Sequence, residues 1–529
     1  MSRSSSMRIR SIKSRRSVRT TAVSRLFGVL LATGLITCAG SAAAHSRHSA
    51  KKLGQLLTVA IPTQPVSMNP AKDGNGPYIY AQTLAYDALI FETAKGTFVP
   101  GLATKWGYVG KGNKTFDLTL RKGVRFSDGT PLTASAVKAS IDYFIAAKGP
   151  LAAYAASIRS VQARGKYSVR INLSSGNPIM ERILDQNAQV GEIISPKALK
   201  HPTALNSSTD GAGPYVLQAS GTVAGDHYTY VPNKYYWNPS QIHYRKVELK
   251  VIATPSSTLQ AMEAGQIDFA AGDPSTYSAA QSAGLDVKLA PVGFMTMFFT
   301  DFGKNTPALA NVKVRQALNY AINRTAVTKA LLGGLGKPTS EFPTLDAWQP
   351  KLANTYPYDP TKAKQLMQEA GYGSGFTLPV LDLAGSSAEA DGMTQAILPY
   401  LQAIGVKVNV TSEPDVNGIV SGLNSKTFGG WVFAWGTQTT WQFIQQVFEP
   451  TSNIQDGFTD PVLQKLWTTG AASPNSTPYW KRIVARLTNQ AYGVPLAQIR
   501  SPFYSVKSIK GVRVGPATFS VDLGNIEPN

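Results

Sequence analysis

The sequence predicts an α/β protein with more than one lobe, and three observations lead to this fold class. The chain has 529 residues, more than a single hydrophobic core usually organises. Apolar residues make up 43% and charged residues 16%, as in ordinary globular proteins. Segments with the period-2 pattern of strands alternate with segments of helical periodicity along the whole chain, and no internal repeat is present.

The N-terminal third contains strand, turn and helix signals in succession. Asp128-Gly129 predicts a tight turn, and Thr133 is a suitable N-cap for the helix that follows. The predicted elements are a buried strand from Leu56 (LLTVAIP), a helix over Tyr78–Phe91, a half-buried strand over Thr115–Leu120, a helix that buries Val137, Ile141, Phe144 and Ile145, and a strand ending at Leu173 (YSVRINL).

The rest of the chain continues this alternation. Asp359-Pro360 supplies an N-cap and a first-turn proline, and glycines end several of the helices. The predicted strands are YVLQA (215–219), VELKVI (247–252), IDFAA (267–271) and VKVNV (406–410), and the predicted helices are Ser256–Ala264, Asn311–Leu332, the segment from Asp359 to Gly371, and Ile397–Ile404.

Residues 1–44 have the organisation of a secretory signal peptide. A basic segment up to Arg25 precedes the apolar run Leu26–Gly40, and the small residues Ala42–Ala44 mark a cleavage point. The run that ends at Cys38 resembles a lipobox, so lipid anchoring through Cys38 is the alternative to cleavage near Ala44, which we favour. After that cleavage no cysteine remains, which excludes disulfides and thiol chemistry. We therefore predict a periplasmic protein.

The positive charge of the chain allows two interpretations. The net charge is +21, and removal of the eight basic residues of 1–44, which contain no acid, lowers it to +13. This charge would suit a polyanion or a membrane surface. No Lys/Arg block follows Lys52, so we interpret the charge as a solvated surface and predict no nucleic-acid partner.

Patterns that hold metals or cofactors, or that carry out catalysis, are lacking after the signal segment. The GGLGKPT stretch at 333–339 imitates a P-loop, but Pro338 follows the lysine where Ser or Thr is required, so a helix C-cap and turn is the better interpretation. No Gly-x-Ser-x-Gly elbow is present. The histidines, none at metal-ligand spacing, are His45, His48, His201, His227 and His243. We predict no metal, no cofactor and no enzymatic activity.

Two aromatic segments stand out. The stretch GGWVFAWGTQTTWQF contains Trp431, Trp435 and Trp441, and VGFMTMFFTDF covers Val292–Phe302. Each segment is compatible with a core strand and a packed helix, and equally with the wall of an aromatic-lined ligand cleft. Composition alone does not separate these two interpretations.

Seven motifs follow one another in a specific order and span most of the predicted mature chain. They are FVPGLATKWGYV, FDLTLRKGVRFSDGTPLTASAV, GAGPYVL with NKYYWNP, AGQIDF, VRQALNYAINRTAV, YDPTKAKQLMQEAGYGSGF and LQAIGVKVNV. Together they resemble the extracytoplasmic solute-binding proteins of family 5, the oligopeptide, dipeptide and nickel type that serves ABC importers.

The resemblance implies a two-lobed periplasmic-binding-protein clamp (type II, cluster C-like) with an additional small domain. Lobe I would combine 53–88, 190–288 and 499–529, the small domain would cover 89–189, and lobe II would cover 289–498. The chain would cross between the lobes near 288 and 498, and a ligand bound between the lobes would favour closure.

One motif departs from the family pattern. In peptide-binding members, a Gly-Trp loop carries an Asp shortly after the Trp, and this Asp holds the α-ammonium of the peptide. Here the loop is Ala434–Thr439, with Gln438 or a Thr in place of the Asp, and no acid lies between Phe428 and Phe448. Because a buried ammonium needs a counter-charge, a neutral or anionic ligand such as a sugar, an opine or a modified amino acid becomes the expectation.

The resemblance implies a monomeric substrate-binding subunit of an ABC importer that delivers a peptide or another small organic solute to membrane permease subunits. Two alternatives are an exported hydrolase with a carboxylate pair across a cleft, and a ligand sensor that partners a membrane receptor. The ligand contacts that we predict are Trp435, Gly436, Gln438, Trp441, Met68, Asn69 and Met295.

Overall fold

The computed structural model describes residues 53–74, 79–383, 388–413, 416–449, 452, 454–456, 458–515 and 521–529. The predicted signal peptide, with Cys38, lies outside these residues.

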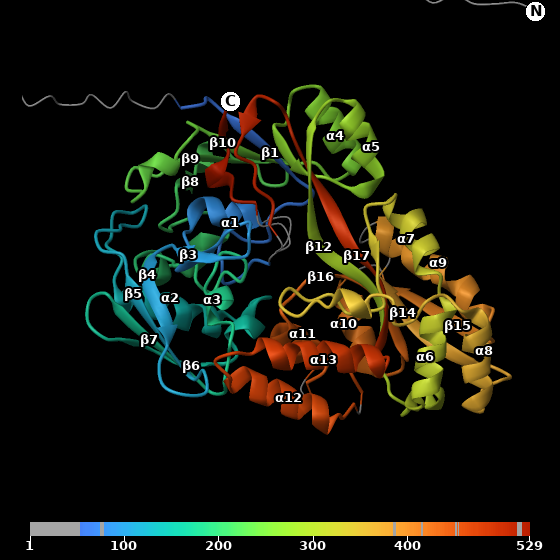
Figure 1. The fold of residues 1–529 in the computed structure, drawn as a ribbon. Helices are drawn as coiled ribbons and strands as arrows, with labels where there is room; N and C mark the ends of the chain where they lie inside the picture. The colour runs from blue at the N-terminus through green and yellow to red at the C-terminus, as the bar shows by residue number, and fades with distance from the viewer. Residues whose placement is uncertain are drawn as a thin grey trace, which may run out of the picture. The chain divides into compact units, whose positions relative to one another are not determined.

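An eleven-stranded mixed sheet is the central feature of the described residues (Figure 1). The strand order is β15-β14-β16-β12-β17-β11-β1-β10-β9-β8, and β13 pairs with β17 beside this path. Its strands are β1 (Leu57–Ile61), β8 (Tyr215–Leu217), β9 (His227–Pro232), β10 (Val247–Val251), β11 (Phe269–Ala271), β12 (Asp286–Phe299), β13 (Lys337–Pro338), β14 (Phe376–Leu383), β15 (Val406–Glu413), β16 (Gly430–Gly436) and β17 (Gly493–Ser505).

Two long strands, β12 and β17, connect the two ends of this sheet. They pair antiparallel from Asp286 opposite Ser505 to Phe298 opposite Gly493, with two irregularities in register. The C-terminal end of β17 also pairs with β11, whereas the C-terminal part of β12 pairs with β16. The predicted crossing points at 288 and 498 fall inside these two strands. The division into lobes itself stays a prediction.

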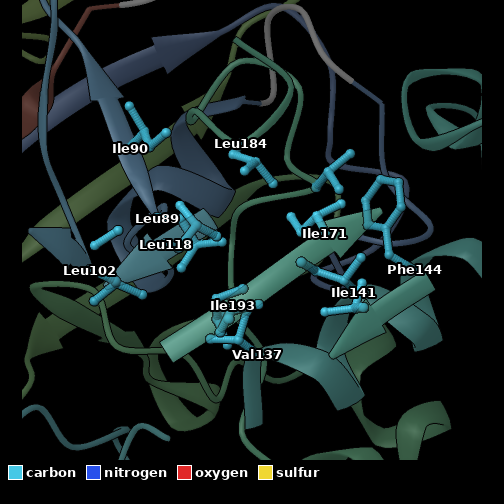
Figure 2. Packing of buried hydrophobic residues seen from close by; sticks show 14 of the residues in the cluster. Leu89, Ile90, Leu102, Leu118, Val137, Ile141, Phe144, Ile171, Leu184 and Ile193 are labelled. Carbon is cyan, nitrogen blue, oxygen red and sulfur yellow. The ribbon is translucent and has the colours of Figure 1, made fainter. Parts of the chain in front are cut away.

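A smaller antiparallel sheet, β4-β5-β7-β6, carries the second core of the chain. The α2 helix packs on it, and Figure 2 shows Val137, Ile141 and Phe144 of this helix among Leu118 and Ile171 of the strands. The remaining strands are β2 (Ile90–Glu92), β3 (Phe98–Pro100), β4 (Ala103–Tyr108), β5 (Thr115–Leu120), β6 (Ile158–Ala163), β7 (Ser168–Leu173), β18 (Ile509–Lys510) and β19 (Glu527–Pro528).

The helices cover both sheets. In the part of the chain after β12, α9 packs on β14, β15 and β16, α6 packs on α8, and α12 packs on α13. The helices are α1 (Ile79–Ala85), α2 (Ala134–Ala147), α3 (Met180–Ile183), α4 (Pro255–Glu263), α5 (Tyr277–Ser282), α6 (Val312–Ala321), α7 (Arg324–Leu332), α8 (Pro360–Glu369), α9 (Ala388–Gln402), α10 (Val416–Ser425), α11 (Thr440–Val447), α12 (Pro461–Ala472) and α13 (Thr477–Asn489).

Three predicted helices differ from the structure. The helix predicted over Ile397–Ile404 is the second half of α9, which begins at Ala388 and ends at Gln402. The helix predicted over Tyr78–Phe91 ends at Ala85, because residues 90–92 pair with residues 98–100 as a strand. The helix predicted over Asn311–Leu332 is two helices. Its break follows from Asn323, whose side chain accepts a hydrogen bond from the Ala326 N–H and so caps a new helix.

The predicted N-cap of α2 is confirmed, and it yields a stability prediction. The Thr133 Oγ1 accepts a hydrogen bond from the Ala136 N–H at 3.2 Å. We expect Thr133→Ala to lower the free energy of unfolding by about 1 kcal/mol, because an amide donor loses its partner. Chemical denaturation measures this loss. Ser135→Ala, at an exposed position of the same helix turn, is the control and should change stability little.

Candidate ligand site

The aromatic stretch singled out above forms a strand and a helix that adjoin each other in sequence. β16 pairs with β12 on one side and with β14 on the other. The chain then turns through Thr437 and Gln438, and α11 begins with a capping box in which Thr439 and Gln442 satisfy each other's backbone N–H groups. A loop held between a paired strand and a capped helix has a fixed geometry, which a ligand-contacting segment requires.

The tryptophans of this stretch belong to one aromatic cluster. The Trp431 ring lies 5.5 Å from Phe298 and 5.7 Å from Trp435, and Trp441 stacks on Trp467 at 5.7 Å. Trp431 and Trp441 are buried, whereas Trp435 keeps part of its surface accessible. The interpretation as a core strand with a packed helix is therefore confirmed for Trp431 and Trp441. The interpretation as a cleft wall stays a prediction.

The turn after β16 presents polar groups with unused hydrogen-bonding capacity. The Gln438 Nε2 donates to Gln446 Oε1 at 2.8 Å. Four buried atoms nearby have no hydrogen-bond partner among the described residues: Trp431 Nε1, Thr437 Oγ1, Gln438 Oε1 and Trp441 Nε1. Because an unsatisfied buried polar group costs free energy, groups of this kind are suited to a ligand that completes their hydrogen bonds.

An acidic side chain from a distant segment adjoins this turn. The Asp346 Oδ1 accepts hydrogen bonds from the Thr440 N–H at 2.8 Å and from the Thr440 Oγ1–H at 2.7 Å. The neighbouring Leu345 N–H donates to the Gln438 carbonyl at 2.9 Å. Burial raises the pKa of Asp346, which still keeps part of its surface accessible. A carboxyl group is therefore present near the turn, although the turn itself contains none.

A buried ion pair between Arg182 and Glu92 lies close enough to Asp346 for the charges of Arg182 and Asp346 to interact. The Arg182 Nη1 and Nη2 donate to Glu92 Oε2 and Oε1 at 2.7 and 2.6 Å. The charges of Glu92, Asp185 and Asp346 all favour the protonated form of Arg182 and raise its pKa against the effect of burial. Burial raises the pKa of Asp185 to about 7. Three acidic groups thus surround one guanidinium, which makes this region a suitable environment for a further positive charge.

The seven predicted contact residues fall into two groups. Trp435, Gly436, Gln438 and Trp441 belong to the β16–α11 segment, and Met295 pairs with Ala434 of β16, but its side chain is buried in a different core cluster from that of Trp435 and Trp441. Met68 and Asn69 lie in the loop after β1, where Met68 is buried and packs in the core around β1.

Asn69 organises its own loop. Its Nδ2 donates to Tyr143 Oη at 2.7 Å, and its Oδ1 accepts from the Ala71 N–H at 3.0 Å. Among the described residues, the hydrogen bonds of Met68 and Asn69 go to other segments than β16 and α11. Their role as ligand contacts, like that of the other five, stays a prediction.

Sequence reasoning missed Asp346 and Arg182. Neither residue belongs to a recognisable motif, and their partners Thr440 and Glu92 are 94 and 90 residues away in sequence. Only the pairing of distant segments brings these groups together, so no local signal was available to identify them.

Metal binding and membrane insertion find no support in the described residues. No three or more His, Cys, Asp or Glu side chains there are grouped so that they could hold a metal ion. In that same part of the chain, every helix is too short or too polar to cross a membrane.

Curated relatives match part of the chain. The glutathione-binding protein GsiB of Escherichia coli O1:K1 is 28% identical over 301 residues, which cover 56% of this chain and 58% of that protein. GsiB of Salmonella choleraesuis is 26% identical over 359 residues, which cover 67% of this chain and 69% of that protein. The match thus spans somewhat more than half of the length of the first of these relatives.

Solved structures match the fold over 90% of the chain. The periplasmic binding protein AgaA of A. tumefaciens R10, in complex with agropinic acid, has a TM-score of 0.75 at 21% identity, and 99% of it is covered. A dipeptide-binding protein of Pseudoalteromonas sp. SM9913, in complex with Met-Leu, has a TM-score of 0.74 at 22% identity, with complete coverage. These similarities confirm the predicted two-lobed α/β solute-binding fold.

The sequence profile described as "Bacterial extracellular solute-binding proteins, family 5 Middle" matches residues 97–453. This range includes the small sheet, β12, Asp346 and the whole β16–α11 segment. The chain therefore belongs to the bacterial extracellular solute-binding proteins of family 5.

Proposed function

We propose that the chain is the substrate-binding subunit of an ABC importer, which captures a small organic solute outside the cytoplasm and delivers it to membrane permease subunits. The observation that carries this proposal is the family match over residues 97–453. A cleft between two lobes supports reversible capture, because a ligand that contacts both lobes stabilises their closed arrangement. Export to the periplasm by the predicted signal peptide and a monomeric state are parts of the same proposal.

The charges near the β16–α11 turn suggest which solute the cleft accepts. We propose a short peptide or an amino-acid-derived solute whose ammonium group lies against Asp346. This carboxyl supplies the counter-charge that the turn itself lacks, and Glu92 and Asp185 leave the surroundings of Arg182 with an excess of acids. The proposal replaces the expectation of a neutral or anionic ligand, which rested on the sequence of the turn alone. Relatives described as binding glutathione and Met-Leu bind ligands of the proposed class.

Native mass spectrometry of the purified chain, before and after mild denaturation, tests this function. We expect release of one or more small masses on unfolding, each belonging to a molecule with a free amino group. Release of a neutral sugar or of an anion without an amino group would contradict the proposed solute class but support the binding function. If nothing is released, a thermal-shift screen with dipeptides and tripeptides should raise the unfolding temperature.

Two other functions give different results. An exported hydrolase would convert its substrate, so measurable turnover in the same samples would contradict the binding proposal. A ligand sensor would bind a solute with the same site but would couple to a membrane receptor. Reconstitution with candidate ABC permease and ATPase subunits separates these cases, because only an importer subunit stimulates their ATP hydrolysis.

The role of Asp346 yields a prediction for ligand affinity. We expect Asp346→Asn to weaken binding of the ammonium-bearing ligand roughly tenfold or more, because the counter-charge is removed while the amide oxygen still accepts from Thr440. Isothermal titration calorimetry with the solute identified above measures this change. The control is Asp142→Asn, an exposed carboxyl paired with Lys138, which should leave affinity unchanged. Equal affinity of Asp346→Asn and the parent protein would contradict the assignment.

A further inference from the structure

A cavity bounded by none of the predicted ligand contacts adjoins the Glu92 backbone, since Phe91 and Gln186 line it and Gln186 hydrogen-bonds to the Glu92 N–H and carbonyl. Its volume is about 180 Å³, and it is formed by α1 and the residues after it, the β2–β3 hairpin, residues 236–241 and residues 521–524. None of the seven predicted contact residues lines this cavity, and neither do Asp346 and Arg182. An apolar cavity of about 150 Å³ holds a benzene molecule, so the space is sufficient for a ligand with one ring.

The walls of this cavity are largely apolar, but two carboxyl groups and the polar side chains of Thr83, Gln186, Asn238 and Gln241 interrupt them. The apolar side chains include Ile79, Leu84, Phe91, Val99, Pro214 and Leu523. The two acids are Asp87, just after α1, and Asp522, near the C-terminus. Each acid lines the cavity and is half-buried, so part of its surface stays accessible.

The Asp87 carboxyl is held in place by aromatic donors. The Trp237 Nε1 donates to Asp87 Oδ2 at 2.6 Å, and the Tyr236 Oη donates to Asp87 Oδ1 at 3.5 Å. Asp522 accepts from the Gly524 N–H at 2.9 Å and from the side chain of Asn525. A carboxylate offers about four lone-pair sites, so both acids retain capacity for another donor.

No cation forms an ion pair with either acid among the described residues. The Arg121 guanidinium, which acts on Asp87 through its charge, stacks on Trp237 at 3.8 Å and donates to the Gly101 carbonyl at 3.2 Å, and the charge of Arg513 acts on Asp522. Burial, helped by the charge of Asp522, raises the pKa of Asp87 to about 7, against the Trp237 hydrogen bond and the charge of Arg121, which lower it. Burial raises the pKa of Asp522 to about 6. A cation placed between the two carboxylates would relieve both their desolvation and their repulsion.

We propose that this cavity is a second binding site, specific for a small organic cation that joins one ammonium group to a ring-sized apolar body. The two carboxylates accept the ammonium protons, and the apolar walls bury the body. The Trp237 ring adds a favourable surface for a cation. We infer an organic cation and not a bare metal ion, because no three or more His, Cys, Asp or Glu side chains of the described residues are grouped to hold a metal, and the apolar walls suit an apolar body.

Isothermal titration calorimetry of the purified chain with benzylamine at pH 8 tests the proposal. At this pH both carboxyls are ionised and benzylamine is protonated. We expect saturable one-to-one binding, with benzyl alcohol and benzoate binding at least tenfold more weakly because they lack the positive charge. Equal binding of benzylamine and benzyl alcohol, or no saturable binding of benzylamine, would overturn the proposal.

Variants assign the binding to this cavity. We expect Asp87→Asn and Asp522→Asn each to weaken benzylamine binding at least tenfold. Thr83→Phe, on the α1 residue that lines the cavity, should abolish binding by filling the space while both charges remain. Thr83→Phe keeps the test decisive in case Asp87→Asn fails to fold because its hydrogen bond with Trp237 is weakened.

Two controls separate this site from the proposed solute site. Asp286→Asn removes an exposed carboxyl on β12, and Trp435→Ala alters the β16–α11 segment, so both variants should bind benzylamine as the parent protein does. Loss of benzylamine binding in Trp435→Ala, with retention in Thr83→Phe, would move the binding to the solute site and overturn the proposal. If Trp435→Ala loses peptide binding but still binds benzylamine, the proposed solute site is affected and the proposal for this cavity stands.

Discussion

Replacing Arg182 by methionine should lower the free energy of unfolding by about 3–5 kcal/mol. The guanidinium makes a two-pronged contact with Glu92, and the side chains of Arg182 and Glu92 are only 13% and 2% exposed. Methionine keeps much of the volume of the arginine stem beside the Phe98 ring. The loss therefore reports mainly the Glu92 charge, which stays buried with Asn187 as its remaining side-chain donor among the described residues.

The ion pair between Arg170 and Asp117 has the same geometry and provides the matched control. Arg170 also makes a two-pronged contact with Asp117, at 2.7 and 2.6 Å, but the two side chains are 27% and 38% exposed. Water solvates the partner left behind, so Arg170→Met should destabilise the protein far less than Arg182→Met does. Chemical denaturation of both variants gives the comparison. Similar losses in the two variants would show that burial does not determine the strength of the Arg182 contact.

A double variant separates the pair from its surroundings. Arg182→Met with Glu92→Gln removes the unpaired charge, so we expect it to recover part of the stability that Arg182→Met loses. A double variant less stable than Arg182→Met would indicate that Glu92 is held mainly by groups other than Arg182.

The sequence predicted elements well where local signals determine them. Thr133 and Asp359 are N-caps in the structure, as predicted, because a side-chain oxygen at that position satisfies an amide three residues later. The GGLGKPT stretch follows the end of α7 with Gly333 in the left-handed conformation, so its interpretation as a helix C-cap is confirmed. These features depend on residues within one or two turns of each other.

Prediction was less successful where distant segments decide the structure. The break between α6 and α7 does have a local signal, the Asn323 cap, which the apolar periodicity of residues 311–332 does not reveal. The contacts of Arg324 after the break are with distant segments: its Nε donates to the Pro495 carbonyl at 2.6 Å and its Nη1 donates to the Tyr356 carbonyl at 3.1 Å. Asp346 was missed for the same reason, because its role near the turn exists only through its contact with Thr440.

Glu341 should control how stability depends on pH. The side chain is fully buried, its Oε1 accepts from the Gln349 N–H at 2.7 Å, and its Oε2 has no partner among the described residues. Burial raises the pKa of Glu341 to about 8, although the Gln349 N–H and the charge of Lys337 oppose this shift. The folded protein therefore holds this carboxyl protonated at neutral pH, whereas the unfolded chain ionises it at its ordinary value of 4.5.

The sign of the pH dependence follows from proton binding. Between about pH 4.5 and pH 8 the folded state binds more protons at Glu341 than the unfolded state, so the stability contribution of this residue falls as the pH rises. Burial raises the pKa of Asp185 to about 7 and that of Asp522 to about 6, so both contribute in the same direction. We expect the ligand-free protein to be most stable at mildly acidic pH.

Glu341→Gln isolates the contribution of one group, because glutamine imitates the protonated acid without titrating. We expect the variant and the parent protein to have similar free energies of unfolding near pH 4.5. At pH 8 the variant should be more stable by about 2 kcal/mol or more, since each pKa unit corresponds to about 1.4 kcal/mol and local rearrangement offsets part of the full shift. Denaturation curves at several pH values measure this difference.

Glu369→Gln is the control, because it changes a solvated carboxyl whose pKa is lowered by Lys313. Its free energy of unfolding should not rise relative to that of the parent protein as the pH increases. A constant difference between Glu341→Gln and the parent protein across this range would mean that the buried carboxyl is already ionised in the folded state, with its charge stabilised by a rearrangement around Gln349 and Lys337.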